Sequence, residues 1–175
     1  METNYNGAYI QCSSPFKLRY LFRYPFHYLV QLESGSRKEH AATYLLGSAY
    51  EDKLGGVIVT AWSNWLSGFA YDVSIYLYPL LNPLTDEETF KMSNFYQSVK
   101  TSTYNIIEVV FAKLPLLKNI KFKKDRYEFC NKIYIRGLQE IGRLPANINP
   151  ADYNPDSTVD LLSRFNLIGG RIKIK

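Results

Sequence analysis

Few side chains in this sequence are suited to nucleophilic or acid–base chemistry. It holds two histidines: His27 lies in an aromatic run and His40 follows Glu39. A hydrolytic site needs a nucleophile, a base and an orienting group close together. Neither the G-x-S-x-G elbow nor a cysteine-protease signature is present. The sequence therefore carries no catalytic signature, and we expect a protein that is not an enzyme.

The two cysteines, Cys12 and Cys130, are too far apart in the chain to form a C-x-x-C motif. Free cysteine usually behaves as a small buried apolar residue, so we expect two buried thiols and leave open whether they lie close together. Zinc and EF-hand motifs are absent from the sequence, and the glycine pairs match no nucleotide-binding loop. The sequence thus indicates neither a metal nor a cofactor.

Positive charge is concentrated in one segment, residues 113–143, which holds nine basic and three acidic residues. Aromatic residues are interleaved with this charge. Cationic side chains neutralise phosphates and aromatic rings stack on bases, so a nucleic-acid-binding module is one hypothesis, although a solvated turn between two helices would look the same. Its candidate contacts are Lys118, Lys121, Lys123, Lys124, Arg126 and Lys132.

Aromatic residues make up 15% of the chain, including 15 tyrosines. Tyrosine, tryptophan and arginine are enriched in protein interfaces, so this surplus favours a subunit completed by its neighbours, although an aromatic core is the plainer alternative. The C-terminal residues alternate in the manner of a strand with a cationic outer face. The candidate interface residues are Tyr20, Phe22, Tyr24, Phe26, Trp62, Trp65, Tyr76, Tyr78, Arg171, Ile172, Lys173 and Ile174.

The elements that must position these residues are predicted from periodicity. Short strands are expected at 8–12, 28–32, 73–78 and 171–175, with a buried helix as the alternative for 73–78. A helix is expected at 38–54, where Ala42, Leu45, Leu46, Ala49 and Tyr50 recur at spacings of three and four.

Two further helices follow. The sequence Thr85-Asp86-Glu87-Glu88 is a capping box, and helical spacing continues to Leu114, before Pro115. A helix of this length is either kinked or extends beyond the body of the domain. A second helix is expected at 125–143, pairing with the first, and a short one beginning at Asp156 or Ser157.

These elements predict an α+β fold: a helix-rich single domain over 1–175 with a long antiparallel helix pair and a small sheet of short strands. We expect an N-terminal mixed segment 1–84, a helical core 85–144, and a C-terminal segment 145–175 with a loop, a short helix and a basic tail strand. The chain length suits one domain.

The segment 54–71 is uncharged but carries too many glycines and polar residues for a good membrane-spanning helix. The N-terminal residues do not form a signal peptide, so we expect an intracellular protein. The leading hypothesis is a non-enzymatic structural or assembly subunit of a larger oligomeric complex, such as a virion or other particle. Nucleic-acid binding through 113–143 is the alternative.

Overall fold

The chain builds one six-stranded antiparallel sheet. The computed structural model describes residues 5–13, 38–53, 56–69, 73–99 and 130–175. Each pair of neighbouring strands runs antiparallel, in the order β4-β3-β2-β1-β5-β6. The strands are β1 (Ala8–Ser13), β2 (Lys38–Leu45), β3 (Ser48–Lys53), β4 (Gly56–Ala61), β5 (Ser74–Tyr78) and β6 (Ile172–Lys173).

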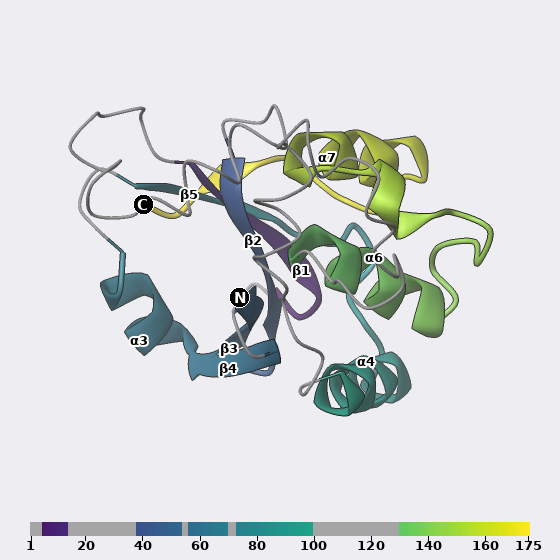
Figure 1. Ribbon diagram of the computed structural model, residues 1–175, viewed down its shortest axis with the longest axis horizontal. Helices are drawn as coiled ribbons and strands as arrows, with labels where there is room; N and C mark the ends of the chain where they lie inside the picture. Colours follow the sequence, from purple (N-terminus) through teal and green to yellow (C-terminus); the bar gives the residue numbers. More distant parts are fainter. Residues whose placement is uncertain (1–4, 14–37, 54–55, 70–72, 100–129) are drawn as a thin grey trace, which may run out of the picture.

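Short helices cover both faces of this sheet, as Figure 1 shows. On one side lie α4 (Asp86–Ser98), α6 (Cys130–Glu140) and α7 (Pro155–Arg164), with the 3-10 turn η3 (Pro150–Asp152) between the last two. On the other side lies α3 (Trp62–Ser67). The expectation of a helix-rich domain built on a long helix pair is therefore wrong, because the sheet dominates the fold.

The segment expected to be a helix at 38–54 is a β-hairpin, formed by β2 and β3. Leu45 pairs with Ser48, and the two residues between them have positive φ angles, 51° at Leu46 and 73° at Gly47. Such a two-residue turn matches the twist of the flanking strands. The apolar residues that fit a helical stripe also alternate between the two faces of a strand, so periodicity alone did not separate the two structures.

The capping box at Thr85 is confirmed. The Glu88 amide donates to Thr85 Oγ1 over 3.2 Å, and the Thr85 amide donates to Glu88 Oε2 over 2.8 Å. The helix α4 that follows ends at Ser98, and the expected continuation to Leu114 lies outside the described residues. The helix expected at 125–143 is present as α6, with residues 125–129 again outside the described part.

Arg143 joins these two helices just beyond the end of α6. Its Nε and Nη2 donate to the two carboxylate oxygens of Glu88, each over 2.7 Å. Its guanidinium also donates to the main-chain carbonyls of Asn82 and Pro83. This bidentate arrangement holds the N-terminus of α4 against the loop that follows α6.

The other predicted elements that fall within the described residues are present with shifted bounds. The strands expected at 8–12 and 73–78 are β1 and β5, whereas the strand expected at 28–32 lies outside the described residues. Helix α7 is capped by Asn154 rather than by Asp156 or Ser157. The tail forms β6, which pairs with β5 of its own chain at one edge of the sheet.

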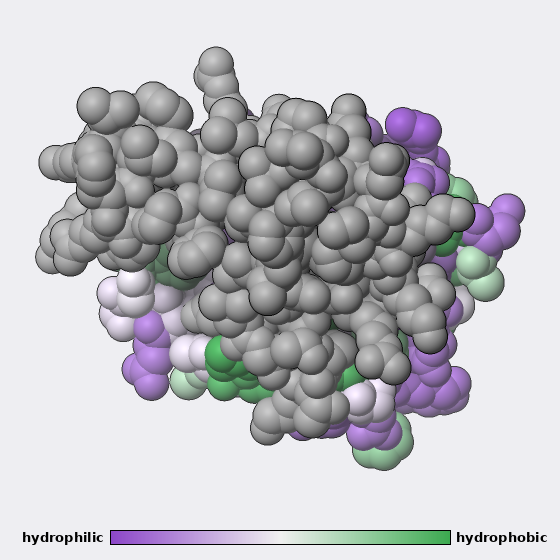
Figure 2. All heavy atoms as spheres, in the orientation of Figure 1, coloured by the Kyte–Doolittle hydropathy of each residue, from purple (hydrophilic) through white to green (hydrophobic). Residues whose placement is uncertain are grey.

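The apolar side chains gather in two clusters, one on each face of the sheet. The larger cluster lies under α4, α6 and α7 and includes Tyr9, Tyr96 and Leu138. The smaller one lies on the face of α3 and includes Ile10, Cys12 and Trp65. The right-hand edge of the molecule, over α4 and α7, is largely hydrophilic in Figure 2. None of the helices among the described residues is long and apolar enough to cross a membrane.

Candidate functional site

The hairpin of β2 and β3 brings His40 and Glu51 into contact. His40 Nε2 lies 2.6 Å from Glu51 Oε2, so the pair shares a short hydrogen bond. The Glu51 side chain is 1% exposed and the His40 side chain is 20% exposed. A buried carboxylate thus holds an imidazole that is still accessible to solvent, which is the arrangement of an orienting group and a general base.

Cys12 lies directly beside this pair in the sheet. It is the ladder partner of His40, and partners in an antiparallel pair project from the same face. Cys12 is 2% exposed and belongs to the smaller cluster with Ile10 and Ala42. Its thiol is therefore buried among apolar side chains on the face from which the imidazole projects.

Cys130, the second cysteine, is the first residue of α6. This helix packs against β2 and β3, the two strands that carry His40 and Glu51. Its apolar residues belong to the larger cluster, so it covers the face opposite to Cys12. The helix therefore lies across the sheet from His40, which projects from the same face as Cys12.

The start of α6 is linked to the sheet on the face opposite to the imidazole. Asn131, next to Cys130, bonds to the turn before α7, and the same turn accepts a hydrogen bond from Gln11 in β1. Successive residues of a strand project from opposite faces, so Gln11 faces α6 and α7, whereas Cys12 and His40 face α3.

On the face that carries α3, the sheet places together the components of nucleophilic catalysis: a base, His40, a carboxylate that orients it, Glu51, and a thiol, Cys12. The structure describes no group of three or more His, Cys, Asp and Glu residues, among the residues it covers, that would hold a metal ion. Acyl transfer to a thiol needs only the base, the nucleophile and hydrogen-bond donors for the developing oxyanion.

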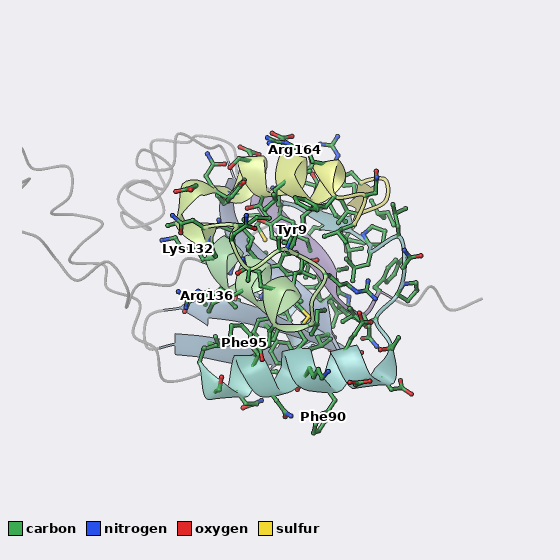
Figure 3. The ribbon with its side chains drawn as sticks, turned by 90° about the vertical axis from the view of Figure 1, so that its right-hand side faces the viewer. Tyr9, Phe90, Phe95, Lys132, Arg136 and Arg164 are labelled. Carbon is green, nitrogen blue, oxygen red and sulfur yellow. The ribbon has the colours of Figure 1, made fainter. Side chains whose placement is uncertain are left out.

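Most of the predicted nucleic-acid contacts, Lys118 to Arg126, lie outside the described residues. Lys132 lies on α6, and Figure 3 shows it on the same side of the helix as Arg136. Both residues are part-buried or exposed at the protein surface. Of the predicted nucleic-acid contacts, Lys132 therefore lies among the described residues, and Arg136 is a second cation beside it.

The predicted interface residues fall into three groups. Tyr20, Phe22, Tyr24 and Phe26 lie outside the described residues. Trp65 and Tyr78 are buried, and Trp62 stacks on Trp65 with ring centroids 5.3 Å apart. In the tail, the Arg171 guanidinium lies 4.6 Å from the centre of the Tyr76 ring, Ile172 and Lys173 form β6, and the Ile174 amide donates to the carbonyl of Ile75.

The His40–Glu51 pair is not predicted from periodicity, because the helix expected at 38–54 contains both residues. A hairpin was also signalled, since residues 41–45 and 48–52 flank a Leu-Gly pair. With the turn placed at Leu46-Gly47, the two residues belong to neighbouring strands. Their side chains then project from one face, which would have marked them as a candidate pair.

Comparison with known proteins places the fold but not the function. No family model matches the chain, and no curated protein matches it either. Among solved structures it is similar to the metalloprotein yiiX of Escherichia coli O157:H7, with a TM-score of 0.53. The two share a fold. The likeness covers 92% of this chain and 82% of yiiX at 14% sequence identity, so it supports the topology and assigns no site.

Proposed function

We propose that the protein is a cysteine-dependent hydrolase or acyltransferase acting on an ester, thioester or amide. The observation that carries this proposal is the hydrogen bond between the accessible imidazole of His40 and the buried carboxylate of Glu51. A carboxylate in this position fixes the tautomer and orientation of the histidine and stabilises the imidazolium that forms during reaction. An exposed structural histidine would not require such support.

The reaction proceeds by proton transfer and acyl transfer. His40 removes the proton from the cysteine thiol, and the thiolate attacks the carbonyl carbon of the substrate. As the carbon–sulfur bond forms and the leaving group departs, His40 returns the proton to that leaving group. Water or a second acceptor, deprotonated by His40, then takes the acyl group and restores the thiol.

We assign the nucleophile to Cys12. It is the ladder partner of His40, so the two side chains project from the same face of the sheet. Cys12 is 2% exposed among apolar side chains, and a thiol in such a setting needs an adjacent base to form the thiolate. Cys130 lies in α6, which packs on the opposite face of the sheet. The test treats the two cysteines separately.

The experiment measures hydrolysis of a chromogenic ester and a thioester by the full chain and its single variants. Cys12→Ala and His40→Ala should each lower kcat/KM by about 10²–10⁴-fold. Cys130→Ala and His27→Ala are the matched controls and should retain activity. Loss of activity in Cys130→Ala alone would move the nucleophile to α6, and full activity in His40→Ala would remove the proposal.

A chelator separates this chemistry from metal catalysis. The structural neighbour yiiX is described as a metalloprotein, and histidine and glutamate are common metal ligands. Thiol-based activity should persist in excess EDTA and vanish after iodoacetamide treatment. Activity that EDTA abolishes and Zn²⁺ restores would instead make His40 and Glu51 metal ligands.

A second candidate function is self-assembly, in keeping with the sequence-based hypothesis of an oligomeric structural subunit. The observation that favours it is β4, the outer strand at one edge of the sheet. Ile58 and Val59 on this strand are 41% and 39% exposed. Exposed apolar edge strands pair readily with other strands. Nucleic-acid binding through 113–143 stays a prediction whose test is salt-dependent affinity.

A further inference from the structure

The indole N–H of Trp65 is a buried hydrogen-bond donor on the face of the sheet that carries α3. Trp65 is 3% exposed, and its Nε1 donates to no acceptor among the residues that the structure describes. An indole nitrogen is a donor only. Buried polar groups nearly always have a hydrogen-bond partner, so an unsatisfied one needs a physical reason. An acceptor that belongs to a bound substrate is such a reason.

Neighbouring rings hold this indole in place. Trp62, in the same helix, stacks on Trp65 with ring centroids 5.3 Å apart and ring planes inclined by 13°. The ring of Phe69 meets Trp65 edge-on, with centroids 4.6 Å apart. Packing against two rings restricts rotation of the side chain, so the N–H keeps one direction.

Hydrogen bonds tie α3 to the sheet at both of its ends. At its start, the Trp62 amide donates to the carbonyl of Gly47 in the β2–β3 turn over 3.0 Å. Beyond its end, the carbonyl of Phe69 accepts a hydrogen bond from Nζ of Lys175 over 2.8 Å. The carbonyl of Lys175 in turn accepts one from the amide of Ile75 over 3.0 Å. The helix therefore reaches across this face from the β2–β3 turn to β5.

The face that α3 crosses contains the thiol. Cys12 pairs with His40 in β2 and with Ile75 in β5, so the three side chains form one row on the same face. Cys12, Ile75 and Trp65 also belong to one apolar cluster. Among the described residues of that cluster, Trp65 is the buried member whose side chain carries an N–H donor.

The main chain at the thiol is engaged elsewhere. Cys12 lies in β1, between β2 and β5, and is paired in both ladders. The main-chain groups of a residue paired on both sides serve those ladders. Acyl transfer to a thiol needs a donor directed at the oxyanion that develops on the carbonyl oxygen. On this face a side chain must supply that donor.

We infer that Trp65 is a catalytic residue, whose indole N–H binds the carbonyl oxygen of the substrate and stabilises the oxyanion formed from it. This inference rests on the proposed function. When the thiolate of Cys12 attacks, the carbon–sulfur bond forms and one electron pair of the carbonyl double bond moves to the oxygen. The oxyanion accepts a hydrogen bond from Nε1, which keeps its proton. The carbonyl then re-forms as the bond to the leaving group breaks, and the leaving group takes the proton from His40.

The test compares two reactions of the same thiol. One is hydrolysis of the chromogenic ester, which passes through an oxyanion. The other is alkylation of Cys12 by iodoacetamide, in which the sulfur displaces iodide from a saturated carbon and no oxyanion forms. Trp65→Phe keeps an aromatic ring but removes the N–H. It should lower kcat for the ester by about 10²–10³-fold and leave the alkylation rate unchanged.

Trp62→Phe is the matched control. It removes an indole N–H from the same helix and the same ring stack, but Trp62 is half-buried and not buried. Both reactions should keep their rates in this variant, and an equal loss of kcat in Trp62→Phe and Trp65→Phe would overturn the inference. Thermal melting shows whether each variant is folded.

A second replacement of Trp65 covers the case in which Trp65→Phe does not fold. Benzothienylalanine, incorporated at this position, has a ring of nearly the same shape in which sulfur replaces the N–H. The same loss of kcat with unchanged alkylation is expected. Full kcat with this side chain would overturn the inference, because the ring is kept and only the donor is lost.

The outcomes separate this inference from the proposed function. Unchanged kcat in a folded Trp65 variant, with hydrolysis that still depends on Cys12 and His40, overturns the donor role alone. Loss of alkylation together with kcat shows that Trp65 supports the packing around the thiol, and it also overturns the donor role. Hydrolysis that persists in Cys12→Ala and His40→Ala overturns the proposed function and the inference with it.

Discussion

At the scale of single residues, two side chains carry the proposed chemistry: His40 Nε2 and Glu51 Oε2 lie 2.6 Å apart. Histidine is the side chain whose unperturbed charge changes near neutral pH, which makes it the common general base. A neighbouring glutamate can orient the histidine only if the carboxylate is itself held in place. Burial supplies this restraint, since the Glu51 side chain is 1% exposed. The buried carboxylate therefore holds the imidazole in one orientation.

Glu51→Gln tests the orienting role. The amide keeps the size of the side chain but loses the negative charge that stabilises the imidazolium. We expect kcat to fall by about 10²–10⁴-fold with little change in KM. Steady-state kinetics on the chromogenic ester measures this effect. Equal activity in the variant and the unmodified protein would show that Glu51 only supports the sheet.

At the scale of elements, the hairpin that carries the pair has a turn residue poorly suited to its conformation. Leu46 has a φ of 51° and is 58% exposed. Left-handed backbone costs about 1–2 kcal/mol for residues other than glycine, with asparagine the most tolerant of the rest. The turn therefore stores strain that no buried contact of Leu46 offsets.

Leu46→Asn should raise the free energy of unfolding by about 1 kcal/mol, since Asn-Gly is the preferred pair in such turns. Urea denaturation measures the change. Leu46→Ala is the control: it removes the same exposed apolar surface but keeps the backbone strain, so it should have almost no effect. An equal increase in the free energy of unfolding in both variants would show that loss of the exposed leucine side chain stabilises the protein, and not relief of strain in the turn.

The contact of α4 with Arg143 makes stability depend on acid. The Arg143 guanidinium, followed by the Thr85 amide, holds the pKa of Glu88 at about 2 instead of 4.5. A carboxyl with a lowered pKa stabilises the fold fully above its ordinary range and loses this effect as the pH falls through its folded value. The contribution of Glu88 is therefore present above about pH 4.5 and is lost toward pH 2.

Glu88→Gln should lower the free energy of unfolding by about 1–3 kcal/mol at neutral pH, the value of hydrogen bonds to charged groups. Urea denaturation from pH 2 to 7 measures it. The difference between the two proteins should shrink below pH 4.5, because the unmodified carboxyl is then protonated on unfolding. A difference that stays constant down to pH 2 would contradict the role of the charge.

Local signals in the sequence predicted some of these elements well. The Thr85 capping box was identified correctly because its residues bond to each other within one turn. The strand at Ala8 was found from a short run ended by turn residues, and the strand at Ser74 from local alternation. The hairpin was missed because spacings of three and four also arise in alternating strands, and the His40–Glu51 pair was missed with it. The pairing of β2 with β3 across the turn at Leu46 depends on contacts between two strands, and the residue spacing within one short stretch of sequence does not show it.

At the scale of the whole molecule, the sheet leaves β4 as an outer strand with apolar residues exposed. If the protein self-associates through this strand, Val59→Lys should convert it to a monomer, because lysine on an edge strand opposes pairing. Light scattering coupled to size-exclusion chromatography gives the mass of each form. A monomeric unmodified protein over a hundredfold range of concentration would end the assembly proposal.

The central claim is that His40 activates a cysteine, and alkylation tests it most directly without any assumed substrate. The unmodified chain and His40→Ala are treated with iodoacetamide at pH 6.5, and the peptides of both cysteines are quantified by mass spectrometry. We predict that Cys12 is alkylated in the unmodified chain and that His40→Ala lowers its rate at least tenfold, with the rate of Cys130 unchanged. Equal reaction of Cys12 in both proteins would contradict the account.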